Sequence, residues 1–152
     1  MSTLIIEKAK LNNLKDLIYL LFDDDLGKDR ENISETSFNN YKKSFMKILN
    51  DTNNEIFIMV LNDQIIGMMQ LTFIPGLSME GMTRCQIESV RIKKDYRNKG
   101  YGSELIKKGI EIAKLNKCGL IQLTSNKERL KAINFYKKLG FKSTHKSFKL
   151  DL

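Results

Sequence analysis

The sequence predicts a mixed α/β fold, because the spacing of its apolar residues switches several times between the alternation of strands and the three-to-four-residue repeat of helices. The expected order of elements is β-α-α-β-β-β-α-β-α-β. The 152 residues contain a single proline, Pro75, and no linker rich in Pro, Gly or Ser. We therefore expect one continuous domain spanning residues 1–152.

The first half of the chain is expected to form a strand, two helices and a hairpin. These segments are residues 3–8, 12 or 13 to 22, 34–50, 55–61 and 64–73. Ser34 and Ser37 can cap the second helix, because their hydroxyl groups accept hydrogen bonds from the first free N–H groups. Asn62-Asp63 is a two-residue turn signal between two strand-like runs, so it predicts the hairpin.

The second half is expected to continue with a strand, a helix, a strand, a helix and one or two closing strands. These segments are residues 86–92, the helix after Gly102 that reaches Leu115, 119–124, 128–139 and 141–150. Gly140 stands where helices commonly end in a glycine. Residues 74–84, reading IPGLSMEGMTR, match neither period and predict a loop. That loop either covers an active site, forms a dimer contact or merely connects two strands.

The net charge of +8 is distributed unevenly along the chain. Residues 1–90 carry a net charge of −4, whereas residues 91–152 carry +12. A basic half suits a polyanionic cofactor and an acidic half suits a cationic acceptor, although a solvated lysine-rich surface explains the lysines equally well. The acidic run Asp23-Asp24-Asp25 is interpreted as a solvated loop rather than a device that steers an acceptor.

Several classes of function are disfavoured by what the sequence lacks. The lysines show none of the aromatic interleaving typical of single-strand platforms, which argues against a nucleic-acid partner. No signal peptide is recognisable, and no apolar run approaches the roughly 20 residues that cross a bilayer, so we expect a cytoplasmic protein without membrane contact. Cys85 and Cys118 stand alone, which predicts buried free thiols and no metal site.

A phosphate-binding loop is the most informative feature of the sequence. Residues 97–102 read Arg-Asn-Lys-Gly-Tyr-Gly and stand between a strand-like run and a helix. Glycine permits positive φ, and the first N–H groups of a helix lack intrahelical partners and lie at the positive end of the helix dipole. A phosphate group is therefore the expected ligand.

Spacing separates three phosphate motifs. A Walker A loop needs four residues between its glycine and a Gly-Lys-Ser/Thr, which is absent. The dinucleotide fingerprint needs a third glycine where Leu105 stands and an acidic residue near Gln122, and the sequence has neither. The six residues instead resemble the R-x-x-G-x-G/A pyrophosphate loop of the GCN5-related N-acetyltransferases, the GNAT family.

A second motif resembles the same family. The segment LTSNKERLKAINFYKKLGF, residues 123–141, contains Ala132, then Tyr136 four residues later, and then Leu-Gly-Phe, as in the family's closing motif. The two motifs cover roughly residues 84–142 in the family's order and spacing. The chain is thus similar to a GNAT N-acetyltransferase.

This resemblance implies a twisted mixed sheet flanked by about four helices, in which the strand ending near Ile92 splays from the strand ending near Thr124. The V-shaped opening would hold acetyl-CoA, the cosubstrate of the family. Residues that the resemblance assigns to acetyl-CoA binding are Val90, Arg91, Ile92, Arg97, Asn98, Lys99, Gly100, Tyr101, Gly102, Ser103, Asn126, Arg129, Ala132 and Tyr136.

Two positions depart from the family pattern. Lys94 stands where the family often has a proline, and Arg129 stands where it often has an asparagine. Arg129 is expected either to reach a phosphate or to shape the acceptor pocket. Asn126 lies near enough in sequence to replace the missing asparagine.

Glu88 is the candidate general base. A free alkylammonium has a pKa of about 10, so acetyl transfer to an amine needs a group that removes a proton. Strand alternation predicts that Glu88 shares a face with Val90 and Ile92. The alternative is an edge glutamate bonded to Ser89 or Arg91.

Tyr136 is the candidate general acid, because it resembles the family's tyrosine that protonates or holds the leaving thiolate. The alternative for Tyr136 is a helix aromatic packed in the core. His145 has no identifiable Ser or Asp partner, so a structural placement is expected.

The predicted function is an acetyl-CoA-dependent N-acetyltransferase in which a primary amine attacks directly within a ternary complex. The acceptor is expected to be a small cationic amine or a protein or peptide amine. The alternative is a non-catalytic acyl-CoA-binding or basic interaction module on the same fold. A homodimer is a further expectation from the family.

Overall fold

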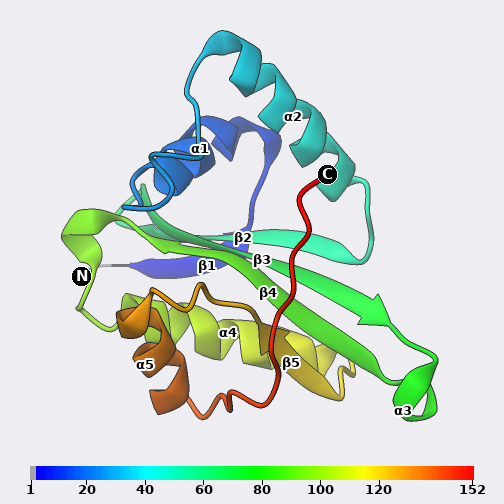
Figure 1. Cartoon of the computed structure of the whole chain (residues 1–152). Helices are drawn as coiled ribbons and strands as arrows, with labels where there is room; N and C mark the ends of the chain where they lie inside the picture. The colour runs from blue at the N-terminus through cyan, green and yellow to red at the C-terminus, as the bar shows by residue number, and fades with distance from the viewer. Residues whose placement is uncertain (1–2) are drawn as a thin grey trace.

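The computed structural model describes residues 3–152 and is built on a five-stranded sheet in the order β1-β2-β3-β4-β5 (Figure 1). Strands β1 to β4 pair antiparallel with their neighbours, and β5 pairs parallel with β4. The strands are β1 Leu4–Lys8, β2 Asn54–Leu61, β3 Gln64–Pro75, β4 Thr83–Ile92 and β5 Leu120–Leu123. The predicted mixed sheet is confirmed.

Helices cover both faces of this sheet. Helices α1 and α2 lie on one face, and α4 and α5 lie on the other (Figure 1). The helices are α1 Leu14–Phe22, α2 Glu35–Leu49, α3 Ser78–Gly81, α4 Tyr101–Leu115 and α5 Leu130–Lys138, with single 3-10 turns at Leu11–Asn13 and Lys94–Tyr96. The mixed α/β class and the order of the first nine predicted elements are therefore confirmed.

Two apolar cores hold the three layers together. Met69 and Leu71 of β3 are fully buried against Leu105 and Ile106 of α4. On the opposite face, the residues that form the second core are Ala9, Leu14, Leu17, Ile18, Leu20, Phe45, Ile58 and Met68. Side chains alternate between the faces of a strand, so neighbouring residues such as Met68 and Met69 pack into different cores.

Local turn chemistry explains several element boundaries. Ser34 caps α2 by accepting a 3.3 Å hydrogen bond from the Ser37 N–H, as predicted. Asn62 and Asp63 both have positive φ, the conformation of a two-residue hairpin turn between β2 and β3. Gly140 follows α5 with φ of 92°, which only glycine adopts without strain.

The loop predicted at residues 74–84 is shorter than expected. Strand pairing continues to Pro75 opposite Thr83, because Pro75 stands at the end of β3 and needs to donate no further ladder hydrogen bond. The remaining connection contains the short helix α3, in which Met79 and Glu80 have left-handed backbone angles. Leu77 and Met79 are exposed, so their side chains do not pack against the rest of the described chain.

The predicted closing strand at residues 141–150 is wrong. Residues 141–152 form no strand, and all but Phe141 are exposed. A strand requires a partner whose N–H and C=O groups complete its ladder, and alternating residues alone do not supply one. His145 lies in this exposed segment, where its Nδ1 is 2.7 Å from the Thr144 hydroxyl. Within residues 3–152, the helices are all too short or too polar to cross a membrane.

Gly67 allows β3 to approach the end of β4 closely, because glycine has no side chain. A Cβ at Gly67 would lie 2.7 Å from Ile92 Cδ1 and 3.0 Å from the Arg91 carbonyl oxygen. Replacement of Gly67 by Ala should therefore push the two strands apart and lower the free energy of unfolding by about 1–3 kcal/mol, measured by urea titration.

Gly119→Ala is the matched control for this substitution. Its added Cβ would meet only the side chain of Met82, which is flexible enough to move away. If the two variants had equal urea midpoints of unfolding, the close approach of β3 and β4 at Gly67 would not contribute to stability.

Candidate active site

The end of β4 has an open edge, which is the central feature of the site. β5 pairs with β4 only from Arg84 to Ile87 and ends at Leu123. Beyond Ile87, Glu88, Arg91 and Ile92 remain paired to β3 on their other side, and the two residues between them form a bulge. Their backbone groups therefore face a gap in the sheet where a ligand with amide groups can add hydrogen bonds.

Arginine side chains bond to two carbonyl groups in this segment. The Arg91 Nη1 donates to the Val90 carbonyl at 2.9 Å, and the Arg97 Nε donates to the Ile92 carbonyl at 2.8 Å. The two carbonyls lie two residues apart, so they point to the same side of the strand. Val90 and Ile92 thus present backbone groups that accept hydrogen bonds from outside the sheet.

A β-bulge at Ser89 changes which side chains share a face. Two residues of β4, Ser89 and Val90, lie opposite the single residue Met69 of β3. Ser89 has φ of 53°, a left-handed conformation that is costly for any residue other than glycine. Beyond the bulge, each side chain of β4 lies on the face of the sheet opposite to the one that uninterrupted alternation would give it.

Glu88 does not share a face with Val90 and Ile92, contrary to the prediction. Val90 and Ile92 pack on the α4 face, whereas Glu88 lies directly opposite Gln70 and therefore on the α1–α2 face. Its side chain is exposed. The bulge at Ser89 is the physical reason. Glu88 remains a candidate base, with a different set of neighbours.

The predicted phosphate loop gives the start of α4 the geometry of an anion seat. Asn98 and Gly100 have φ of 61° and 87°, which turn the chain sharply into the helix. No side chain caps α4, and within residues 3–152 the N–H groups of Tyr101, Gly102 and Ser103 donate to no acceptor. A Cβ at Gly100 would meet nothing within 4 Å, so the space over the helix end is open.

The two sequence motifs meet at Gly102. A Cβ on this residue would lie 3.3 Å from Phe135 Cζ of α5 and 3.9 Å from Ile92 Cγ1 of β4. The glycine therefore allows the start of α4 to approach both other elements of the site. Lys99 extends over the Tyr96 ring, 5.6 Å from its centroid, next to the same loop.

Arg97 contacts the acidic connection between α1 and α2. Its Nη2 donates to the Asp23 carbonyl oxygen at 2.5 Å and lies 3.5 Å from the Asp23 carboxylate. The Lys94 N–H donates to the same carboxylate at 2.9 Å. The connection is thus fastened to the phosphate loop rather than free in solvent.

Asp24 joins two arginines of the site. Arg129 forms two hydrogen bonds to the Asp24 carboxylate, and the Arg91 Nη2 lies 3.7 Å from it. Burial alone would raise the pKa of Asp24, but the Arg129 hydrogen bonds and the two positive charges outweigh burial and lower it. The interpretation of residues 23–25 as a solvated loop is therefore wrong for Asp23 and Asp24.

Tyr136 lies on α5, with its ring edge-on to Phe135 and Phe141 at centroid distances of 5.1 and 5.8 Å. Burial raises the pKa of Tyr136, and the nearby charges of Arg91 and Arg129 only partly oppose it. The phenol is therefore neutral at physiological pH and carries the proton that a general acid needs.

Other predicted site residues occupy less direct positions. The Asn126 side chain accepts a 2.9 Å hydrogen bond from the Glu128 N–H and is exposed, so it shapes the turn into α5. Ala132 is partly buried on α5. Cys85 is buried, as predicted, and burial together with the nearby Cys118 raises its pKa to about 12. Cys118 is only partly buried.

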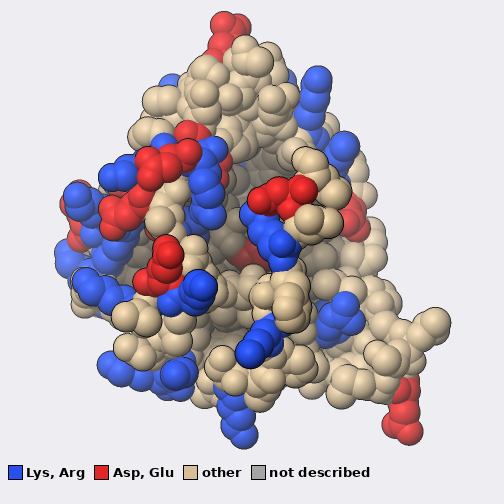
Figure 2. Space-filling model, viewed as in Figure 1, with Lys and Arg blue, Asp and Glu red and all other residues tan. Residues whose placement is uncertain are grey.

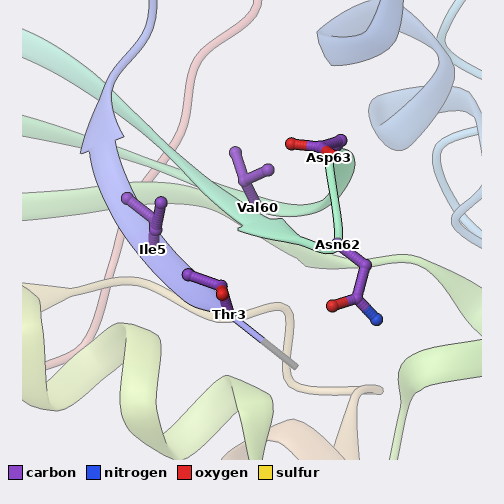
Figure 3. Close-up of a pocket in the computed structure, with 5 residues that line it drawn as sticks. All are labelled: Thr3, Ile5, Val60, Asn62 and Asp63. Carbon is purple, nitrogen blue, oxygen red and sulfur yellow. The ribbon is translucent and has the colours of Figure 1, made fainter. Parts of the chain in front are cut away.

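Two hollows lie on opposite parts of the sheet. A pocket of about 160 Å³ lies between α1, α2 and the sheet and reaches Gln70 and Ser89. A larger hollow of about 350 Å³ lies over β1 and the hairpin turn (Figure 3). Its lining contains no residue of the predicted site, and β1 and β4 are separated by two strands. Only the smaller pocket adjoins the open edge of β4.

Sequence reasoning missed the involvement of Ser89, Gln70 and Asp24. Ser89 carries no glycine signal for its positive φ, and Gln70 lies inside an ordinary strand pattern. Asp24 stands in a visible acidic run, but its partner Arg129 is 105 residues away. The charge difference between the two halves of the chain was the one available signal for this contact.

Replacement of Asp24 by Asn should lower the free energy of unfolding at pH 7 by about 1 kcal/mol, the lower range for a charged hydrogen bond that reaches solvent. Folding lowers the pKa of this carboxyl below its ordinary 3.8. Its stabilisation is therefore complete at neutral pH and is lost as the pH falls through the folded-state pKa. Urea unfolding should show the difference at pH 7 and a smaller one below about pH 4.

Asp25→Asn is the control for this prediction, because Asp25 is exposed and takes part in none of the ion pairs among the described residues. The same loss of stability in both variants, or a loss independent of pH, would contradict the role assigned to Asp24.

Comparison with known proteins agrees with this geometry. The chain is 33% identical over 89 residues to a glucosamine 6-phosphate N-acetyltransferase of Trypanosoma brucei brucei, which covers 59% of this chain and 58% of that relative. The chain therefore spans less than two thirds of the length of that curated relative.

Solved structures give closer matches over the whole chain. A transcriptional regulator from Bacillus halodurans C-125 is 38% identical, with a TM-score of 0.94 over 99% of this chain and 100% of that chain. A predicted acetyltransferase from Clostridium acetobutylicum, solved with acetyl-CoA, is 19% identical with a TM-score of 0.77 over 98% and 96%, which shows the fold alone. The model of the Acetyltransferase (GNAT) family matches residues 15–141, and the chain belongs to this family.

Proposed function

We propose that this protein is an acetyl-CoA-dependent N-acetyltransferase that transfers an acetyl group directly to a primary amine in a ternary complex. The observation that carries the proposal is the open edge of β4 beyond Ile87, next to the uncapped start of α4. An amide-bearing arm and an anionic group fit these two features side by side. Membership of the GNAT family supports the same donor.

The donor would be held mainly by backbone groups. The carbonyls of Val90 and Ile92 accept from the Arg91 and Arg97 side chains, and the second lone pair of each would accept from the donor. The N–H groups of Tyr101, Gly102 and Ser103 would bind the pyrophosphate at the positive end of α4. Acetyl-CoA supplies an acyl group activated as a thioester. Arg97, Asn98 and Lys99 complete the proposed loop.

Glu88 and Tyr136 would handle the protons of the reaction. The exposed carboxylate of Glu88 lies on the α1–α2 face, where it can take a proton from the amine directly or through water. The neutral phenol of Tyr136 can give a proton to the leaving thiolate or donate a hydrogen bond to it. Glu88 lies on the α1–α2 face of the sheet and Tyr136 packs on the α4 face, so the proposed base and acid are kept apart.

Several finer points belong to this proposal. The 1–152 chain would act as one catalytic domain in the cytoplasm, and dimerisation remains a prediction from the family. Arg129 is bonded to Asp24, so it would shape the acceptor side unless a phosphate replaces that carboxylate. A protein amine and a small amine are both compatible with the open α1–α2 face.

Substitution of Gly100 by Asp should weaken acetyl-CoA binding by at least about tenfold, because it places a negative charge where the pyrophosphate would bind. Isothermal titration calorimetry measures the effect directly. A Cβ at Gly100 would meet nothing within 4 Å, so the cost to folding is the backbone strain of a residue other than glycine at φ of 87°, which the control variant shares.

Gly140→Asp is a matched control, because Gly140 also has positive φ and open space but lies beyond α5. It should bind acetyl-CoA like the unmodified protein. Absence of acetyl-CoA binding by the unmodified protein would refute the proposed function.

Substitution of Tyr136 by Phe should lower kcat by roughly 100-fold, the typical contribution of a general acid, with little change in acetyl-CoA affinity. Phe retains the aromatic contacts to Phe135 and Phe141 and removes only the hydroxyl. Release of free coenzyme A thiol gives the rate, and calorimetry gives the affinity. A proportionate loss of affinity and rate would instead indicate a structural role for the ring.

A non-catalytic module is the second candidate function. The observation that favours it is the 38% identity to a protein described as a transcriptional regulator. In that case, Glu88→Gln and Tyr136→Phe should leave any acetylation unchanged while acetyl-CoA binding persists. Loss of acetylation in both variants would favour the enzyme.

A further inference from the structure

We infer that the acceptor is a primary amine with an uncharged, apolar body, such as a branched aliphatic chain or a single aromatic ring. The inference rests on the proposed acetyl transfer and adds the substrate class. It departs from the small cationic amine that the charge of the N-terminal half suggested. The observation behind it is the pocket between α1, α2 and the sheet, next to the bulge at Ser89.

The walls of this pocket are almost entirely apolar. Its lining residues come from α1, α2, β2, β3 and β4, and the apolar members are Leu14, Leu17, Ile18, Leu21, Phe45, Ile48, Ile56 and Met68. Several of them belong to the second core, so the walls are fixed by packing rather than formed by mobile loops. A ligand group of similar shape gains free energy by leaving water here.

No Asp, Glu, Lys or Arg lines the pocket. A second ammonium group, as in a diamine or polyamine, would lose part of its hydration against these walls, and the Glu31 carboxylate bonded to the hydroxyl of the lining residue Tyr41 is not itself part of the lining. A sugar amine would leave several hydroxyl groups without hydrogen-bond partners against the apolar walls. The lining therefore disfavours both classes of acceptor.

The volume of the pocket suits a small apolar group. Its roughly 160 Å³ is close to the volume of the closed ~150 Å³ cavity, lined by Leu, Ile and Phe, that binds benzene in an engineered protein, although this pocket opens to solvent on one side. One ring or four to five carbon atoms would fill such a space. A longer chain would have to extend past Ser44 and Tyr41 into solvent.

Polar groups lie at the sheet end of the pocket, where the amine would react. Ser89 has its hydroxyl at the bulge in β4. The Gln70 side chain donates to Asn54 at 2.9 Å, which leaves its carbonyl oxygen to accept from an amine N–H. Glu88 lies directly opposite Gln70 and on the same face. The amine nitrogen would thus lie beside two uncharged acceptors and the proposed base.

This arrangement lets the two substrates meet at the open edge of β4. The anion seat belongs to α4, on one face of the sheet, and the pocket belongs to α1 and α2 on the other. The sheet is interrupted between them beyond Ile87 and Leu123. An amine in the pocket can therefore reach a thioester held along residues 88–92 without crossing an intact strand ladder.

The experiment uses the full chain and compares primary amines that differ in the group attached to the amine nitrogen. Isoamylamine, phenethylamine, 1,4-diaminobutane and glucosamine are titrated into protein saturated with coenzyme A, which cannot transfer an acetyl group. Acetylation rates are then measured with acetyl-CoA. The first two amines should bind at least about tenfold more tightly than the others and should show the higher kcat/KM.

Substitution of Ser44 by Trp should place an indole over the pocket mouth and weaken phenethylamine binding by at least about tenfold, with coenzyme A binding unchanged. Ser44 is exposed on α2, so the variant should fold. Lys43→Trp is the matched control, because Lys43 is exposed on the opposite side of the same helix and does not line the pocket.

Each result decides one point. Equal or tighter binding of 1,4-diaminobutane or glucosamine, or no effect of Ser44→Trp, overturns the inference while leaving acetyl transfer intact. Failure of coenzyme A to bind contradicts the proposed function itself. A free amine and a peptide N-terminus share this chemistry, so phenylalanine amide is tested beside phenethylamine. Tighter binding of the amide would identify a peptide-like source.

Discussion

The loss of the β5 partner beyond Ile87 is the constraint on which the site depends. A strand inside a sheet uses its N–H and C=O groups for pairing, so it has none left for a ligand. β5 ends at Leu123, whereas β4 continues for five residues held by β3 alone. The fold thus provides a fixed strand edge that is unpaired where a substrate arm could bind, and β3 prevents that edge from moving.

The bulge at Ser89 gives the same strand a second role. Without it, residues 87, 89 and 91 would share one face. The extra residue instead sends Arg91 toward the α1–α2 side, where it meets Asp24, and sends Val90 and Ile92 toward α4. The strained backbone at Ser89 is therefore what places Arg91 on one face of the sheet and Val90 and Ile92 on the other.

Features encoded by short stretches of sequence could be predicted, and features made by distant contacts could not. The glycine loop, the α5 motif and the caps depend on neighbouring residues, and all were recognisable. The face on which Glu88 lies could not be predicted, because the bulge that decides it occurs at a serine. The pocket is built from α1, α2 and three strands, so no local pattern describes it. The prediction of a closing strand at residues 141–150 was wrong for a related reason. Alternation of apolar residues does not reveal whether another strand is available for pairing.

The opposite charges of the two halves also acquire a more specific meaning. The composition suggested that the basic half binds the polyanionic donor and that the acidic half binds a cationic acceptor. In the structure, Asp23 pairs with Arg97, and Asp24 pairs with Arg91 and Arg129, so acidic residues of the first half neutralise arginines of the second. Figure 2 shows basic and acidic side chains close together on this face. The acidic connection thus binds arginines of the second half, and the proposed acceptor pocket beneath α2, which no charged residue lines, would select by shape and polarity.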